Sequence, residues 1–297
     1  MLKRRIIFDR SAFHGNRFDR LLSSSLMKLS KQRRISIYHS PILIEETIRM
    51  YMKEKNREEL RRQLPFIFEI CQERWFRGRS ELWSKELVEE AGEKGSVFMP
   101  DIERRMTEEN IKRMVFHDDF DENMFECAIK EIDENKIKAG RIKEISIKMR
   151  SDVSERLKSV RKSRCDIKQT AEEYVDLTSD DTGTEILTKH LITKNPLEIA
   201  DKWRKHKKRF PYFTLFVRGL LYLTYYVMAE PNEPIDDNAL IDISQLTYLH
   251  GADIIVSNDE KFMKKTFDFM YKGRSKRMMT CEQFVAYLKE IDNTDTR

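Results

Sequence analysis

Short apolar strands that stop at an acidic or polar turn, each followed by a helix, constrain this chain most. The first strand, Arg4–Phe8, stops at Asp9. The second, Ile35–His39, stops at Ser40-Pro41, where Ser is a good helix cap and Pro suits the first helical position; this helix is expected to run to about Asn56. Alternating strands and helices predict a parallel sheet in an α/β fold.

The C-terminal part repeats this pattern. A buried helix over about 212–229 precedes a loop at Pro231–Pro234, and the strand Ala252–Ser257 ends at an acidic turn, 258–260. The sequence also predicts a short strand at 277–279 and helices over 237–250, over 261–271 and after Thr280, which forms a capping box with Gln283.

Residues 56–210 differ from both ends because they are highly charged and nearly without strand signals. Apolar residues at helical spacing over 122–138 favour a helix there, whereas 176–183 (DLTSDDTG) is typical of a loop. We therefore expect residues 1–55 and 211–297 to form one discontinuous α/β domain, interrupted by a mostly helical insertion.

Charge is distributed unevenly, although the formal net charge of the whole chain is only +5. Residues 1–55 and 136–210 each carry +8, residues 56–135 carry −8 and residues 211–297 carry −3. The basic segments predict a surface that faces a polyanion. For the acidic segment we expect an internal charge match or a protein partner.

The four widely spaced cysteines form no metal-ligand motif and fit a reducing compartment, so we expect a cytoplasmic protein. The N-terminus has no apolar run long enough for a signal peptide. The most apolar stretch, 212–228, is shorter than a typical membrane span and contains Arg218, which favours a buried helix and no membrane partner.

Two carboxylates are expected at one edge of the sheet. Asp9 follows the first strand, and Asp259 follows the strand Ala252–Ser257. Open parallel sheets place their sites at the carboxyl ends of strands, so the two acids share an edge if their strands are parallel. Both residues equally suit the plainer role of helix N-cap.

Glu46 is unusual because it lies on an apolar helix stripe, with Ile42 and Met50 four residues away on either side. Its neighbour Glu45 is ordinary, because Arg49 stands four residues on and can form a solvated ion pair with it. A functional role is therefore the preferred interpretation of Glu46, with a structural role as the alternative.

Asp242 is the stronger anomaly, because it is expected several residues inside a helix and among apolar neighbours such as Leu246 and Leu249. A carboxylate there is costly unless a metal ion or a shared proton resolves it. Asp237, near the start of the same helix, reads as an ordinary cap but is an alternative ligand. Converging carboxylates are tolerated when divalent cations neutralise them, and all-oxygen sites suit Mg²⁺ or Mn²⁺.

Four segments together resemble PIN-domain nucleases, a family that includes the toxins of toxin–antitoxin pairs. They are Ile6–Phe13 (IIFDRSAF), Tyr38–Thr47 (YHSPILIEET), Asp242–Leu249 (DISQLTYL) and Gly251–Phe262 (GADIIVSNDEKF). The last is the most specific, because an apolar strand ends in Ser-x-Asp, with Gly-Ala-Asp before it and a Phe after it.

The resemblance assigns the four acids of the family site to Asp9, Glu46, Asp242 and Asp259, with Ser11 as the small polar residue that supports Asp9. The chain departs from the family at Asp9-Arg10-Ser11, where Asp-Thr-Asn or Asp-Ser-Asn is frequent. Variable spacing to the last acid also leaves Asp237 as a competitor of Asp242.

The resemblance implies a Rossmann-like α/β/α sandwich and a nuclease that depends on Mg²⁺ or Mn²⁺, most often an endoribonuclease. RNA is therefore the expected substrate, with an acidic antitoxin or another protein as a possible partner, and a homodimer as a possible assembly. The alternatives are a DNase that uses the same site and an inactive scaffold that binds RNA or protein.

The run at 202–209 (KWRKHKKR) is the candidate nucleic-acid contact, alongside the basic stretch 136–168. Such side chains contact phosphates without reading sequence, although a solvated helix face is the plain alternative. Trp203 is expected to anchor its helix in the core rather than to stack on a base. The predicted contact residues are Lys202, Arg204, Lys205, Lys207, Lys208 and Arg209.

Overall fold

The computed structural model describes most of the chain. The described residues are 4–53, 56–71, 74–89, 97–116, 167–190, 195–229 and 238–293, with the single positions 137, 141 and 144. The predicted loop 231–234 lies outside this part, as do nearly all residues of the helix predicted over 122–138 and of the basic stretch 136–168.

The centre of the fold is a parallel sheet of four strands in the order β2-β1-β3-β4. These strands fall where the sequence predicts them, although two are shorter than expected. Their bounds are β1 (Arg4–Phe8), β2 (Ile35–Ile37), β3 (Ile254–Val256) and β4 (Arg277–Met279).

Helices make up most of the remaining structure. They are α1 (Asn16–Leu22), α2 (Leu26–Lys31), α3 (Pro41–Lys53), α4 (Arg57–Ile70), α5 (Arg79–Leu87), α6 (Asp101–Phe116), α8 (Ile167–His190), α9 (Pro196–Lys205), α10 (Pro211–Ala229), α11 (Ala239–Tyr248), α12 (Phe262–Met270) and α13 (Cys281–Asn293). Three short 3-10 helices are η1 (Arg10–Phe13), η2 (Lys207–Arg209) and η3 (Leu249–Gly251).

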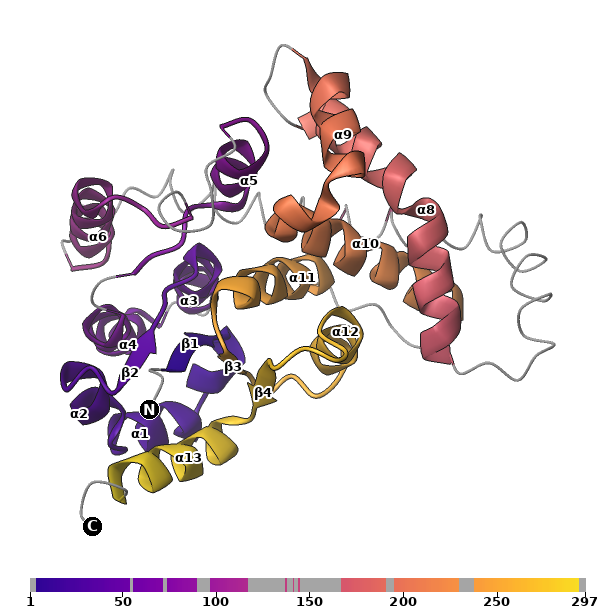
Figure 1. Ribbon diagram of the computed structural model, residues 1–297. Coiled ribbons are helices and arrows are strands. Elements are labelled where there is room, and N and C mark those ends of the chain that lie inside the picture. Colours follow the sequence, from indigo (N-terminus) through magenta and orange to yellow (C-terminus); the bar gives the residue numbers. More distant parts are fainter. Residues whose placement is uncertain are drawn as a thin grey trace.

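Both faces of the sheet are buried, as near-continuous apolar strands require. Ile7 and Ile255 point into one core, which also contains side chains of α10, α11 and α12. Ile6, Phe8 and Val256 alternate with them and point into a second core, which contains side chains of α1, α2, α4 and α13. Helices α10, α11 and α12 lie on one side of the strands, and α1 and α13 lie on the other (Figure 1). The structure therefore confirms an α/β fold around a parallel sheet.

The structure confirms the two helix starts that the sequence predicts at Ser40 and Thr280. The Ser40 hydroxyl accepts the backbone N–H of Leu43 at 3.3 Å at the start of α3. At the start of α13, the backbone N–H of Thr280 donates to the Gln283 side chain at 3.0 Å, and Thr280 Oγ1 accepts from the N–H of Gln283 at 3.3 Å. These bonds satisfy N–H groups that a helix cannot pair by itself.

The apolar helix α10 is a core helix, as expected. Its Arg218 pairs with Glu172 of α8 and lies over the ring of Phe269, 4.3 Å from the centroid. Its N-terminus is capped by the buried carboxylate of Glu86, which accepts the N–H groups of Tyr212 and Phe213 at 2.9 Å each. Within the described ranges, no helix combines the length and apolarity needed to cross a membrane.

The prediction of a loop at 176–183 is wrong, because these residues lie inside α8. Hydroxyl groups that favour turns are satisfied within the helix: Thr178 donates to the carbonyl of Tyr174 and Thr184 to that of Asp180, each at 2.7 Å. Packing of α8 against α9 and α10 overrides the local propensity.

Gly183 makes this packing possible, because a Cβ there would stand 2.1 Å from the ring of Trp203. Trp203 is fully buried, and its Nε1 donates to Thr214 at 3.0 Å. The expectation that Trp203 anchors its helix in the core is therefore confirmed.

The division into residues 1–55 with 211–297 and an insertion at 56–210 stays a prediction. The described contacts show that the core continues beyond residue 55, because α4 packs against α2 and α3 and contributes Leu64 and Ile67 to the second core. Several acids of the segment 56–135 are matched internally, since Glu81 and Glu103 pair with Arg77.

We predict that Gly183→Ala destabilises the protein by about 1–3 kcal/mol, because overpacking against Trp203 outweighs the better helix propensity of Ala. Urea unfolding followed by circular dichroism measures the change. Gly78→Ala is the control, because nothing lies within 4 Å of a Cβ at that position. Equal stability of the two variants would contradict the proposed packing.

Candidate functional site

The carboxyl ends of β1 and β3 bring Asp9 and Ser257 together. The two strands pair in parallel, with Phe8 opposite Val256, and the N–H of Asp9 continues the ladder by donating to the carbonyl of Val256 at 2.9 Å. The carboxylate of Asp9, which is 6% exposed, accepts the hydroxyl of Ser257 at 2.8 Å. The predicted common edge for the two strand ends is therefore confirmed.

Ser11 supports Asp9 as expected. Its backbone N–H donates to Asp9 Oδ2 at 3.1 Å, and its hydroxyl donates to the same oxygen. The Ser11 hydroxyl also accepts the backbone N–H of Asn258 at 2.8 Å, so it ties the loop after β1 to the loop after β3. Asp9 therefore caps η1, as the plainer interpretation requires, and is held in one orientation.

Asp259 belongs to the same hydrogen-bonded loop. Its backbone N–H donates to Ser257 Oγ at 3.1 Å, and its Oδ1 accepts the N–H of Lys261 at 2.8 Å. The Asn258 side chain connects the loop to α13, because its Oδ1 accepts the N–H of Cys281 at 3.0 Å. Asp259 therefore does not cap α12, whose N-cap residue is Lys261 and has no side-chain capping bond; it forms a bond within the preceding turn and is linked to Asp9 through Ser257.

Glu46 of α3 is electrostatically coupled to Asp9. Glu46 as a whole is half-buried, but its Oε2 atom is fully covered and has no hydrogen-bond partner among the described residues. Burial, followed by the negative charge of Asp9, raises the pKa of Glu46 to about 8, although Arg10 and Arg49 oppose the rise. Glu45 differs as predicted, because it is exposed and pairs with Arg49 at 3.9 Å.

Asp242 is buried, but it lies in the first turn of α11 and not several residues inside a helix. The helix starts at Ala239, so an acid at this position also suits the helix dipole. One turn later, the Gln245 amide donates to the carbonyl of Phe8 at 2.6 Å, and Gln245 Oε1 accepts from Ser40 at 2.6 Å. These bonds dock α11 on the carboxyl ends of β1 and β2.

The four predicted acids are brought together unequally. Asp9 and Glu46 interact through their charges, and Asp259 joins them through a hydrogen-bonded loop. Asp237 lies outside the described residues. Among the residues that the structure places, no three His, Cys, Asp or Glu side chains come together as a metal site. The metal set of Asp9, Glu46, Asp242 and Asp259 therefore stays a prediction.

The Asp9–Glu46 pair nevertheless suits a hard cation. Mg²⁺ is commonly bound by one or two protein carboxylates, and water and substrate phosphates complete its shell. The covered Oε2 of Glu46 is an acceptor without a donor in the described structure, and the charge of Asp9 disfavours a second negative charge beside it. A divalent cation would pair with the covered Oε2 of Glu46 and offset the repulsion between the two carboxylates.

Three residues at this edge have roles that the sequence does not predict. Ser257 could have been found, because a small polar residue precedes the acid in the Ser-x-Asp turn. Gln245 and Arg10 carry no comparable signal, because their partners are distant in the chain. Arg10 is only 6% exposed, and its Nη2 donates to the sulfur of Met50 at 3.0 Å.

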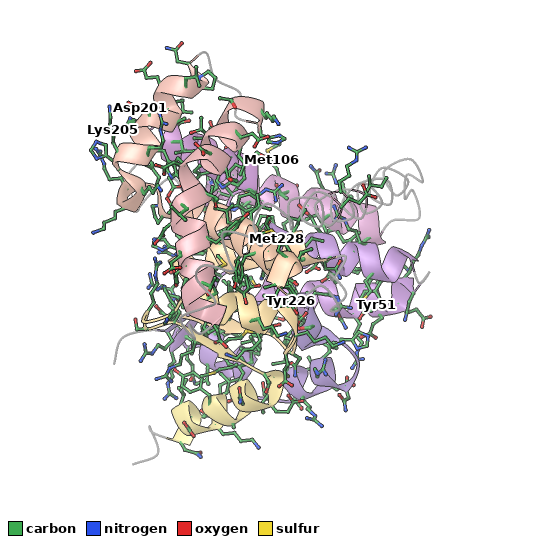
Figure 2. The ribbon with its side chains drawn as sticks, turned by 90° about the vertical axis from the view of Figure 1, so that its right-hand side faces the viewer. Tyr51, Met106, Asp201, Lys205, Tyr226 and Met228 are labelled. Atoms are coloured by element: carbon green, nitrogen blue, oxygen red, sulfur yellow. The ribbon has the colours of Figure 1, made fainter. Side chains whose placement is uncertain are left out.

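The basic run on α9 and η2 lies away from this edge. The two helices pack on α8 and α10, while the strand ends are covered by α3 and α11 (Figure 1). Asp201 and Lys205 of α9 lie on the opposite side of the view from Tyr51 of α3 (Figure 2). Lys205 pairs with Asp201 at 2.6 Å and Lys207 with Asp180 at 2.5 Å, so part of the run is matched by nearby acids.

Comparison of the chain with protein-family models, with curated proteins and with solved structures found no match. The resemblance to PIN-domain nucleases therefore rests on the motif residues alone.

We predict that Glu46→Gln, measured in EDTA, stabilises the protein more at pH 9 than at pH 5, by about 4 kcal/mol. The folded-state pKa of Glu46, about 8, is above its ordinary value of 4.5, so the wild type loses stability as pH rises from about 4.5 to about 8, and the loss is complete above that pH. Gln has no proton to lose. Thermal unfolding across this pH range measures the difference; Glu45→Gln is the control, and an unchanged difference between pH 5 and 9 would contradict the coupling.

Proposed function

We propose that this protein is a metal-dependent nuclease that hydrolyses phosphodiester bonds, with RNA as its substrate, and that its site is the carboxyl edge of β1 and β3. The supporting observation is the pair formed by Asp9 and Glu46. Asp9 follows β1 and Glu46 lies on α3, and the negative charge of Asp9 acts on the Glu46 carboxyl group. This is the edge of the sheet at which open parallel sheets bind ligands. The motif resemblance supports the same site.

The proposal gives each residue a separate task. Asp9 would bind the cation in a fixed orientation, because Ser11 and Ser257 already hold its Oδ2. Glu46 would provide a second oxygen ligand, and Asp242 and Asp259 would provide the remaining carboxylates of the site. A bound Mg²⁺ or Mn²⁺ would supply an activated water and stabilise the leaving oxygen.

We expect Asp9→Asn and Glu46→Gln each to reduce RNA cleavage at least about 100-fold, because each removes an oxygen charge that the cation requires. EDTA should abolish cleavage, and Mn²⁺ should restore it. A fluorescent single-stranded RNA measures the rates. Glu45→Gln is the matched control, because it changes an exposed carboxylate one residue away on the same helix.

The outcomes distinguish the alternatives. Cleavage that survives Asp9→Asn and Glu46→Gln would place the chemistry elsewhere, and cleavage in EDTA would remove the metal from it. Faster cleavage of a DNA of matched sequence would favour the DNase. Binding of RNA without cleavage, equal in wild type and Asp9→Asn, would favour an inactive scaffold.

The basic run gives a separate prediction, because its position suits contacts to nucleotides remote from the cut. The double variant Lys208→Ala, Arg209→Ala should bind a long RNA more weakly. The slope of log affinity against log salt concentration should fall by the amount expected for the loss of about two phosphate contacts. The cleavage rate at saturating RNA should be unchanged. Binding titrations at several salt concentrations measure this slope. An unaltered slope would show that these side chains form a solvated surface that does not contact RNA.

A further inference from the structure

Arg10 is a buried cation beside the acid pair. It follows Asp9 directly and begins η1, and its side chain extends toward α3. There the guanidinium lies 4.9 Å from the centroid of the Tyr51 ring, and Nη2 donates to Met50 Sδ at 3.0 Å. The side chain of Tyr51 also forms a hydrogen bond with Arg10. All these partners are neutral, whereas a buried guanidinium normally selects carboxylate or phosphate.

The remaining donors of Arg10 have even less compensation. Its Nε and Nη1 atoms are fully covered and have no hydrogen-bond partner among the described residues. Leaving a charged donor buried without a partner is costly, so such an arrangement is retained when the charge itself has a task. The covered Oε2 of Glu46 is an acceptor in the same situation, and Glu46 lies one helical turn before Met50, a residue of α3 that Arg10 contacts.

We propose that Arg10 is an internal counter-cation: it offsets the charge of Asp9 and Glu46 in the metal-free protein and lowers the affinity of this edge for a divalent cation. The inference rests on the proposed function, because it concerns the same site. Arg10 is a positioning residue in this account, since its covered guanidinium acts on Asp9 and Glu46 and not on the substrate. The Arg occupies the position where the PIN-like motif frequently has Thr or Ser.

The sign of the effect follows from charge. A divalent cation adds two positive charges to the edge, and at most one proton leaves Glu46 in exchange. Binding therefore adds at least one net positive charge near Arg10 under any protonation of Glu46. A fixed positive charge opposes this addition, and it does so strongly where water is excluded.

The test compares Mn²⁺ binding by wild type, Arg10→Met and Arg10→Lys, using electron paramagnetic resonance of free Mn²⁺. Arg10→Met keeps an unbranched side chain against Met50 and Tyr51 but removes the charge, so we expect about tenfold tighter binding. Arg10→Lys keeps the charge, so we expect wild-type affinity. Arg20→Met, which removes an exposed cation paired with Glu282, controls for net charge and should leave affinity unchanged.

A second measurement addresses folding. In EDTA at pH 9, Arg10→Met should lower the melting temperature, and adding Glu46→Gln should recover part of the loss, because the double variant removes the charge that lost its counter-ion. Additive effects of the two substitutions would overturn the pairing.

The failures are distinguishable. Mn²⁺ binding that Asp9→Asn abolishes, but that is equal in wild type and Arg10→Met, would overturn the role of Arg10 and leave the nuclease proposal standing. If neither wild type nor Arg10→Met binds Mn²⁺, both proposals fall.

Discussion

The parallel pairing of β1 with β3 is the constraint on which the rest of this site depends. Its register places Phe8 opposite Val256, and one further bond, from the N–H of Asp9 to the Val256 carbonyl, carries the ladder to the start of both loops. Asp9 and Ser257 meet for this reason. A slip of one residue would send alternate side chains to the other core and separate them, so the backbone ladder, more than any side-chain contact, sets where the first acid stands.

The acids at the two ends of these strands have pKa values shifted in opposite directions. At the amino end, Asp253 accepts the backbone N–H of Arg5 at 2.9 Å and pairs with its guanidinium at 2.8 Å. Burial acts to raise the pKa of Asp253, but the bonds and charge of Arg5 outweigh it and lower that pKa. At the carboxyl end, Glu46 has no comparable partner among the described residues, and its pKa rises. A structural acid is neutralised where it stands, whereas the pair at the carboxyl end is left short of positive charge.

The fold was predictable where its determinants are local. The strand at Arg4–Phe8, the start of α3 at Pro41 and the capping box at Thr280 all depend on neighbours a few residues away. The errors involve partners distant in the chain. Gly183 lies in a helix because Trp203 packs on it, and the burial of Arg10 depends on side chains of α3, 40 residues on. At the site, Asp9, Ser11 and the Ser-x-Asp turn were readable as motifs, but the electrostatic state of Glu46 requires the three-dimensional neighbourhood that sequence spacing does not supply.

The helices around α10 influence the strand ends through packing. Glu86 caps the N-terminus of α10, and Glu172 of α8 pairs with Arg218 in its middle, so acids from residues 56–210 stabilise this helix. α10 packs on α11, and α11 holds the carbonyl of Phe8 through Gln245. The residue after Phe8 is Asp9. Three successive contacts therefore connect α8 and α5 to the residue before the first acid, which makes these two helices of residues 56–210 part of the framework of the edge.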